Sequence, residues 1–268
     1  MTSDPALPIV HWVETHADPD GRDQVAGLAK GLRLVEAFDT AHTRMTLSEA
    51  ARRTGLSPAA ARRCLLTLLK MGYVCSDGKR FWIGPGALRF AYAYTASDRL
   101  ARGLQPVLDA LCERSQETAA LCVLDGGAVV IAARSSARRN MRVGNAVGSR
   151  LPLHCSAAGR ALMADLPTER WRSLLGEQPM RAYTLRTVVS VDAMATVIAQ
   201  CQALDYGFSD EEIEPGVRSV AVPIRAPDGR TVASVGLSAR SERMGLSELV
   251  QRFLPSLRLA QSRALDLL

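Results

Sequence analysis

The spacing of apolar residues after residue 23 predicts an amphipathic α-helix near the start of the chain. This helix is expected to begin near Gln24. Its apolar positions recur every three or four residues, as on one face of a helix: Leu28, Leu32, Val35 and Phe38. Residues 1–23 are rich in Asp, Pro and His and are expected to form a loosely held tail. The folded chain therefore begins with a helix that needs partners to cover its apolar face.

Two further helices are predicted after a short polar connection. Thr46 with Glu49 is the signature of a capping box, and Gly55 ends that helix early. Ser57 then caps a second helix, with Pro58 at its first position, which ends before Gly72. Its expected buried face is formed by Ala61, Leu65, Leu68 and Leu69. Such a pair is typical of a helix-turn-helix, although an ordinary helical hairpin with a basic, solvated face would have the same spacing.

A β-hairpin is predicted directly after these helices. Two short apolar runs, 73–75 and 81–83, flank a polar segment that contains Asp77 and Gly78. Asp-Gly favours a type I′ turn, which needs positive φ angles. Lys79 and Arg80 place positive charge at the tip of the hairpin. A helix-turn-helix followed by a basic hairpin is the winged variant of that motif.

The distribution of charge distinguishes the two interpretations of the helix pair. Residues 44–89 contain nine basic and two acidic side chains, a net charge of +7. The whole chain carries only +6, so the other 222 residues sum to −1. A basic footprint confined to one segment indicates binding to nucleic acid, here double-stranded DNA.

We expect the second helix of the motif, residues 57–70, to enter the major groove. Small side chains at its start allow close approach, and its two arginines can reach guanine edges or phosphates. The hairpin is expected to touch the backbone or minor groove, while Arg44, Arg52 or Arg53 contact phosphates. The candidate DNA-binding residues are Arg44, Thr46, Ser57, Ala59, Ala60, Arg62, Arg63, Thr67, Lys70, Lys79 and Arg80.

After Gly84-Pro85-Gly86, the chain is predicted to form one mostly apolar helix from Ala87 to about Leu104. This helix either packs on its own domain or forms the contact between two subunits. We favour the contact between subunits, because winged modules usually read paired half-sites as dimers.

The remainder of the chain alternates short strands and helices. Turns at Asp125–Gly127 and Pro227–Gly229 predict two β-hairpins, and Ser156 and Ser190 are helix caps. The expected strands are 120–124, 128–132, 141–147, 218–224 and 231–237, and the expected helices are 107–115, 157–164, 190–205 and a last one from Ser247 that Pro255 kinks or splits. Consecutive hairpins imply an antiparallel sheet with helices packed on it, an α+β domain.

Composition and motifs narrow the class of protein further. The six cysteines are scattered without a C-x-x-C pair, so neither a disulfide framework nor a zinc ribbon is expected. No segment approaches the ~20 apolar residues that span a bilayer, and a cytoplasmic protein without a membrane partner is expected. The second domain has one histidine, His154, adjacent to Cys155 rather than facing it, and no catalytic or phosphate-binding motif occurs. We therefore expect no enzyme, no metal site and no cofactor.

Four segments resemble the IclR family of transcriptional regulators: Leu28–Val35, Thr46–Tyr73, Leu151–Ala161 and Asp210–Pro223. The resemblance covers the chain from about residue 24 to the end. It implies a winged helix-turn-helix (24–86), a linker and dimerisation helix (87–105) and a GAF-like antiparallel-sheet effector domain (106–268). It also implies a homodimer or dimer of dimers, with a small organic acid as effector.

Within that family, residues 62–68 and 147–152 are most similar to the branch that controls protocatechuate, p-hydroxybenzoate and β-ketoadipate catabolism. An aromatic-acid pathway is therefore expected. Two alternatives stay open: a regulator that answers a non-aromatic acid such as glyoxylate or pyruvate, and a ligand-independent DNA-architectural protein. Ser219 and Gly236 replace a cysteine and a serine of the glyoxylate-responsive members, which weakens the first alternative. The large, nearly neutral second domain weakens the second.

The effector site is expected around the start of the helix that Ser156 caps. Small residues there leave backbone N–H groups accessible to a carboxylate. Arg150 and His154 either pair with that carboxylate or only order the loop. The residues that the resemblance implies for this site are Leu153, Ser156, Ala157, Ala158, Asp210, Ser219 and Ser238. The further candidates for effector binding are Met141, Gly144, Arg150 and His154.

Overall fold

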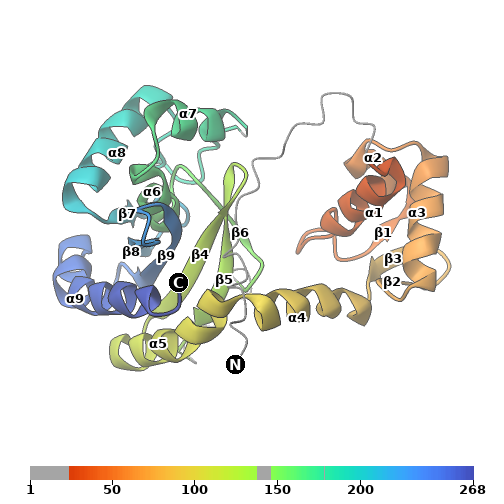
Figure 1. Ribbon diagram of the computed structural model, residues 1–268. Helices are drawn as coiled ribbons and strands as arrows, with labels where there is room; N and C mark the ends of the chain where they lie inside the picture. Colours follow the sequence, from red (N-terminus) through yellow and green to blue (C-terminus); the bar gives the residue numbers. More distant parts are fainter. Residues whose placement is uncertain (1–23, 138–145, 178) are drawn as a thin grey trace, which may run out of the picture. The chain divides into compact units, whose positions relative to one another are not determined.

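The computed structural model describes residues 24–137, 146–177 and 179–268. The described chain falls into two compact units, and the boundary between them along the sequence lies between Ser97 and Asp98. The N-terminal unit consists of α1 (Ala26–Glu36), β1 (Met45–Thr46), α2 (Leu47–Thr54), α3 (Pro58–Lys70), β2 (Val74–Ser76), β3 (Arg80–Ile83), the 3-10 turn η1 (Pro85–Ala87) and α4 (Leu88–Ser97) (Figure 1). Its three strands form an antiparallel sheet in the order β1-β3-β2. The helix-turn-helix and the hairpin are thus confirmed, and β1 is an additional strand that pairs with the hairpin.

The buried faces of α1 and α3 differ from the faces that the sequence predicted. α1 turns Leu34 into the core, where it is fully buried, while Leu28 and Leu32 remain 63% and 43% exposed. On α3, Ala61 and Leu65 are fully buried, but Leu69 is 36% exposed. These expected faces were wrong because the apolar residues of each helix can be grouped at intervals of three or four in more than one way, and each grouping defines a different face. Contacts from the neighbouring elements then select the buried one.

The hairpin turn also differs from the expected type I′. Only Gly78 has a positive φ, +90°, and Asp77 does not. The Asp77 carboxylate instead accepts hydrogen bonds from the backbone N–H groups of Lys79 and Arg80, at 2.9 and 2.8 Å. These bonds lower the pKa of Asp77 and hold the tip in one conformation.

The C-terminal unit consists of α5 (Arg99–Ser115), β4 (Thr118–Asp125), β5 (Ala128–Ser135), β6 (Arg150–Pro152), α6 (Ala157–Ala164), α7 (Thr168–Gly176), α8 (Val191–Leu204), β7 (Gly207–Asp210), β8 (Val217–Arg225), β9 (Thr231–Arg240) and α9 (Leu246–Leu265). Its sheet is antiparallel throughout, in the order β6-β5-β4-β9-β8-β7. Helices α6, α7 and α8 cover one face, and α5 and α9 pack on the other (Figure 1). Both predicted hairpins and the α+β class are confirmed.

Several predicted boundaries in this part of the chain are wrong. The helix expected over 87–104 is divided at Asp98, whose side chain caps α5 by accepting a hydrogen bond from Ala101 N at 2.9 Å. Pro106 and Pro255 lie inside the continuous helices α5 and α9, so Pro255 does not split the last helix. Helix α7 was not predicted. Of the strand expected over 141–147, residues 141–145 lie outside the described chain, and Val147 is in a turn.

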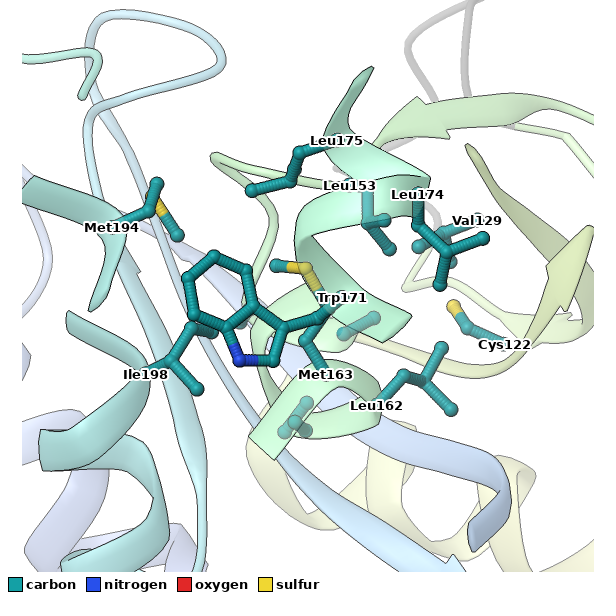
Figure 2. Close-up of a cluster of buried hydrophobic side chains, with 14 of the residues drawn as sticks. Cys122, Val129, Leu153, Leu162, Met163, Trp171, Leu174, Leu175, Met194 and Ile198 are labelled. Carbon is teal, nitrogen blue, oxygen red and sulfur yellow. The ribbon is translucent and has the colours of Figure 1, made fainter. Parts of the chain in front are cut away.

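A hydrophobic core between the sheet and α6–α8 fixes the position of α6. Trp171 of α7 lies in this core together with Met163 of α6 and Met194 and Ile198 of α8 (Figure 2). Every residue of α6 is buried. The start of α6 is therefore held rigidly beside the sheet, where the main cavity of this unit opens.

Candidate nucleic-acid interface and ligand cavity

Local chemistry sets the start of α3, the helix expected to read DNA. The Ser57 hydroxyl accepts a hydrogen bond from Ala60 N at 3.3 Å, and Pro58 occupies the first helical position. Beyond this cap, the helix exposes a polar and basic surface. Its exposed members are Ser57, Ala59, Arg62, Arg63, Thr67 and Lys70, and Ala60 is half-buried. Because the apolar side of α3 is packed in the core, this surface is the one that can face a ligand.

The hairpin adds a second basic edge to the same unit. Lys79 and Arg80 are exposed at its tip. Ser76 stabilises the turn by donating a hydrogen bond from its hydroxyl to Arg80 O at 2.9 Å and accepting one from Gly78 N at 3.0 Å. An ordered loop presents its charges at lower entropic cost than a flexible one, which suits contacts to a phosphate backbone.

Three other predicted DNA contacts have structural partners within the unit. Thr46 forms the predicted capping box: its N–H donates to a Glu49 carboxylate oxygen at 2.7 Å, and its hydroxyl accepts from Glu49 N at 3.3 Å. The Arg44 guanidinium stacks over the Trp82 ring at 4.3 Å. Arg53 donates to Ala37 O at 3.1 Å and pairs with Asp39 at 2.7 Å. Arg53 thus braces α2 against the segment that follows α1.

The C-terminal unit contains a cavity of about 320 Å³ between its sheet and the start of α6. Both apolar and charged side chains reach it. Its walls are formed by Glu117, Thr118, Ala120, Cys122, Ile131, Arg134, Leu151, Ser156, Ala157, Ala158, Ser209, Ile213, Glu214, Val217, Ser219, Val220, Ala221, Gly236, Leu237, Ser238, Ala239 and Arg240. A cavity of this size accommodates a small organic molecule.

Strand register arranges the floor of this cavity in two rows. Thr118, Ser238, Ser219 and Ser209 lie opposite one another across β4, β9, β8 and β7, so their side chains share one face. The hydroxyls of Ser219 and Ser238 are 2.8 Å apart. The adjacent row carries Arg134, Ala120, Gly236 and Ala221 across β5, β4, β9 and β8. The small residues in this second row give the cavity its depth.

Part of the wall is the first turn of α6. The Ser156 hydroxyl accepts a hydrogen bond from Gly159 N at 3.0 Å, as the sequence predicted. Ala157 and Ala158 line the cavity with their small side chains. Gly207 of β7 lets this turn approach closely, since a Cβ there would lie 2.2 Å from Ala157 O. The free backbone N–H groups of a helix start attract negative or electron-rich groups.

Arg134, the cationic residue at the β5 side of the cavity, was not predicted from the sequence. Its Nε is buried without a hydrogen-bond partner, and no carboxylate of the described chain pairs with its guanidinium. Desolvation lowers its pKa. The signal in the sequence was a single arginine at the end of an otherwise apolar strand, Ala128–Ser135. A guanidinium in this situation is a ready partner for a carboxylate.

The other charged groups in the wall have partners. Glu214 pairs with Arg240 at 3.4 Å. Glu117 is fully buried and pairs with Arg243, which lies outside the wall, at 3.0 Å. Among the described residues of the wall, Arg134 is therefore the charged group for which no ion pair is seen.

Some expected effector residues lie away from this cavity. Arg150, Leu153 and His154 line a separate cavity of about 200 Å³ beside α7. Arg150 pairs with Asp125, and the Nε2 of His154 lies 3.1 Å from Arg181 O. Burial lowers the pKa of His154, which favours its neutral form.

Asp210 also makes ion pairs rather than lining the main cavity. It contacts Arg218 at 2.5 Å and Arg186 at 2.7 Å. Met141 and Gly144 lie outside the described residues. Of the expected effector residues, the structure therefore brings Ser156, Ala157, Ala158, Ser219 and Ser238 together in one cavity wall.

A buried ion pair holds α6 in position. The Arg160 guanidinium binds both carboxylate oxygens of Glu212, at 2.5 and 2.6 Å, and donates from Nε to His154 O at 2.9 Å. Both side chains are buried. This bidentate pair ties the helix to the segment after β7 and was not predicted from the sequence.

Three thiols of this unit, those of Cys122, Cys155 and Cys201, are poor nucleophiles and metal ligands. Burial raises the pKa of Cys122 and Cys155 to about 12 and that of Cys201 to about 11, so all three are protonated near neutral pH. Within residues 24–137, 146–177 and 179–268, His, Cys, Asp and Glu side chains do not gather into a group that could hold a metal ion. None of the helices in those ranges is long and apolar enough to cross a membrane.

Two family profiles match the chain, one for each unit. Residues 27–78 match the IclR helix-turn-helix domain. Residues 92–266 match the C-terminal domain of bacterial transcriptional regulators of the IclR type.

Individual proteins extend this similarity over nearly the whole chain. The chain is 38% identical to the Pca regulon regulatory protein of Pseudomonas putida over 91% of this chain and 84% of that protein. It is 34% identical to the p-hydroxybenzoate hydroxylase transcriptional activator of Acinetobacter baylyi over 88% of this chain and 89% of that protein.

Solved structures show the same fold. A transcriptional regulator from Rhodococcus sp. RHA1 superposes with a TM-score of 0.77 at 37% identity, covering 91% of this chain and 98% of that one. A double mutant of the inducer-binding domain of PobR from Acinetobacter, in complex with 3-hydroxybenzoic acid, covers 63% of this chain and 98% of its own, with a TM-score of 0.59 and 26% identity.

Proposed function

The chain belongs to the IclR family of bacterial transcriptional regulators, and we propose that it controls an aromatic-acid catabolic operon in response to an acid bound in the C-terminal unit. The observation that supports this proposal is that one chain combines a basic surface suited to DNA with a separate cavity suited to a small acid. The N-terminal unit exposes a basic, capped helix and a basic hairpin. The C-terminal unit has a 320 Å³ cavity with one unpaired guanidinium among its described residues.

The proposed DNA contact uses α3 in the major groove and the hairpin on the backbone or minor groove. Arg62 and Arg63 follow directly after the small residues at the start of α3, so they reach base edges or phosphates once the helix enters the groove. Lys79 and Arg80 touch phosphates from the hairpin. Thr46 contributes by capping α2, and Arg44 reaches the backbone from its position over Trp82.

The proposed effector contacts are Arg134, the first turn of α6 and the hydroxyls of Ser219 and Ser238. An aromatic acid is favoured by the names of the two relatives and by the hydroxybenzoate in the PobR complex. Arg150, His154 and Asp210 order their own segments through polar contacts, and Leu153 packs in the hydrophobic core, so we place none of the four against the effector. A two- or three-carbon acid such as glyoxylate or pyruvate would leave most of the cavity unfilled.

We divide the chain into a winged helix-turn-helix (24–86), a linker region (87–105) and an effector domain (106–268). We propose that it works in the cytoplasm as a homodimer or dimer of dimers and has no catalytic activity. Exposed large apolar residues on α4, Leu88, Phe90 and Tyr92, support a contact between subunits there. The effector would then change how the two DNA-binding units of a dimer are placed. The position of the operator relative to the promoter decides whether the protein represses or activates.

Lys79→Ala is expected to weaken binding to every DNA sequence by a similar factor. Because Lys79 contacts phosphate rather than bases, its loss should reduce the slope of log K against log salt by about one unit. Fluorescence anisotropy of specific and random duplexes over a salt series measures both quantities. An unchanged slope, or a loss confined to the specific duplex, would show that the hairpin does not contact the backbone as proposed.

A thermal-shift screen of the full chain tests the effector assignment. The panel contains p-hydroxybenzoate, protocatechuate, β-ketoadipate, muconate, glyoxylate and pyruvate. A ligand at 100 times its Kd stabilises its protein by about 2.7 kcal/mol, which gives a measurable rise in Tm. Stabilisation by an aromatic acid supports the proposal, and stabilisation by glyoxylate or pyruvate alone would replace it with the non-aromatic alternative.

A further inference from the structure

Helix α4 leaves the N-terminal unit without a hydrophobic core to fix its direction. The structure describes all ten residues of α4, and none of them is buried. Figure 1 shows α4 extending away from α1, α2 and α3 rather than packing along them. The direction of such a helix depends on the contacts made at its start.

Arg89, in the first turn of α4, supplies several of these contacts. Its Nη2 donates a hydrogen bond to Met71 O at 3.0 Å, at the C-terminal end of α3. Its Nε donates to Gly86 O at 3.2 Å, in the turn that precedes α4. The guanidinium carbon lies 4.6 Å from the centre of the Tyr73 ring. Because a guanidinium is planar and rigid, contacts on its edge and on its face together fix both the position and the direction of α4.

Phe90 and a close approach of two glycines complete this junction. The rings of Phe90 and Tyr73 are stacked, with centroids 5.1 Å apart. Gly86 N donates a hydrogen bond to Gly72 O at 3.1 Å, and a Cβ on Gly86 would clash with that same oxygen. Arg89, Tyr73 and Phe90, here called the junction cluster, therefore join α4 to the C-terminal end of α3.

The location of the junction cluster connects it to DNA reading. The cluster contacts the last residue of α3, whereas Arg62 and Arg63 lie in the first half of that helix. Ser57 and Met71 are about 21 Å apart along the helix, so a change of roughly 10° between α3 and α4 moves the start of α3 by about 4 Å. In a twofold dimer the displacements of the two helices along the DNA add. Their sum exceeds the rise of one base pair, about 3.4 Å.

We propose that Arg89 is a positioning residue, which together with Tyr73 and Phe90 fixes the angle between α3 and α4 and thereby sets the distance between the two half-sites that a dimer reads. This inference rests on the proposed function, in which α4 forms the contact between subunits. Phe90 is 53% exposed, so it stacks on Tyr73 and still has surface for that contact. Base preference within each half-site comes from α3, whereas the spacing of the half-sites comes from the junction cluster.

Operators with altered spacing separate these two properties. An operator that the full chain selects from a random library is lengthened or shortened by about two base pairs between its half-sites. The native protein should bind the altered operators at least about tenfold more weakly than the selected one. Arg89→Met should reduce this spacing penalty to less than about threefold, because α3 can then adjust its angle to α4. Both affinities are measured on one protein preparation, so their ratio does not depend on the fraction that is folded.

A base-pair mismatch within one half-site is the internal control. It should weaken binding by the same factor in Arg89→Met and in the native protein, because α3 is unchanged. Arg33→Met, on the exposed surface of α1, is the matched control and should keep the native spacing penalty. An unchanged spacing penalty in Arg89→Met, or its absence in the native protein, would overturn the inference and leave the proposed regulator in place. Equal affinity of the native protein for all DNA sequences would overturn the proposed function as well.

Two variants at Tyr73 make the test independent of Arg89. Tyr73→Leu removes the ring on which Arg89 and Phe90 lie, and should relax the spacing as Arg89→Met does. Tyr73→Phe retains the ring and should keep the native penalty, so relaxed spacing in this variant would contradict the inference. Sedimentation velocity gives the oligomeric state of each protein. If Arg89→Met and Tyr73→Leu were monomers where the native protein is a dimer, the cluster would hold the subunits together instead of setting an angle, and the inference would be overturned.

Discussion

Replacement of Arg160 by methionine is expected to lower the free energy of unfolding of the C-terminal unit by about 3–5 kcal/mol. The change leaves the Glu212 carboxylate buried without the guanidinium that binds both of its oxygens, at 2.5 and 2.6 Å. It also leaves His154 O without its hydrogen bond from Arg160 Nε. Because α6 begins at the main cavity, the loss should weaken effector binding as well as the fold.

Urea unfolding of the full chain, followed by circular dichroism, measures this loss. A domain of this size unfolds roughly 2–4 °C lower for each kcal/mol lost, so the Tm provides a second readout. Arg230→Met, which breaks the exposed pair with Asp228, is the matched control and should cost less than about 1 kcal/mol. The double variant Arg160→Met/Glu212→Leu should recover much of the stability, since it removes both charges together. A loss below about 1 kcal/mol for Arg160→Met would show that the pair does not hold α6.

Arg63→Ala is expected to relax the sequence preference at one base pair in each half-site. A good arginine–guanine contact provides about 1–3 kcal/mol of discrimination, so a mismatch at that position should cease to matter in the variant. Operators selected from a random library by the native protein and by the variant give the preference at each position. Lys79→Ala is the contrasting variant, because it should weaken all sequences alike.

The outcome for Arg63→Ala also decides which helix reads the DNA. If specific and random duplexes bind the variant as tightly as the native protein, α3 is not the recognition helix. In that case its basic surface would be the solvated face of an ordinary helical pair.

Features that depend on neighbouring residues were predictable from the sequence. Thr46, Ser57, Ser156 and Ser190 each cap the expected helix, because a capping side chain bonds to an N–H only two or three positions away. The two hairpins of the effector domain were predictable for the same reason, since each turn carries its own Asp-Gly signal.

Features that depend on distant residues were not predictable. Arg160 and Glu212 are far apart in sequence, and nothing near either residue indicates its partner. Arg134 lines the cavity because the sheet and the start of α6 bring residues that are distant in the sequence together around it, and no residue near Arg134 in the sequence indicates this. The break at Asp98 was hidden by apolar residues on both sides that continue the helical pattern. For α1, the spacing predicted a helix, but contacts with the rest of the unit decided that Leu34 faces the core.

Linkage between the two sites is the most direct test of a regulator that couples acid binding to DNA binding. The Kd of 4-hydroxybenzoate for the full chain is measured with and without a saturating selected operator, and the Kd of the operator with and without the acid. Coupling requires both ligands to change each other's affinity by the same factor, typically about 5- to 150-fold. Identical Kd values with and without the other ligand, while both ligands bind, would contradict an effector-controlled regulator.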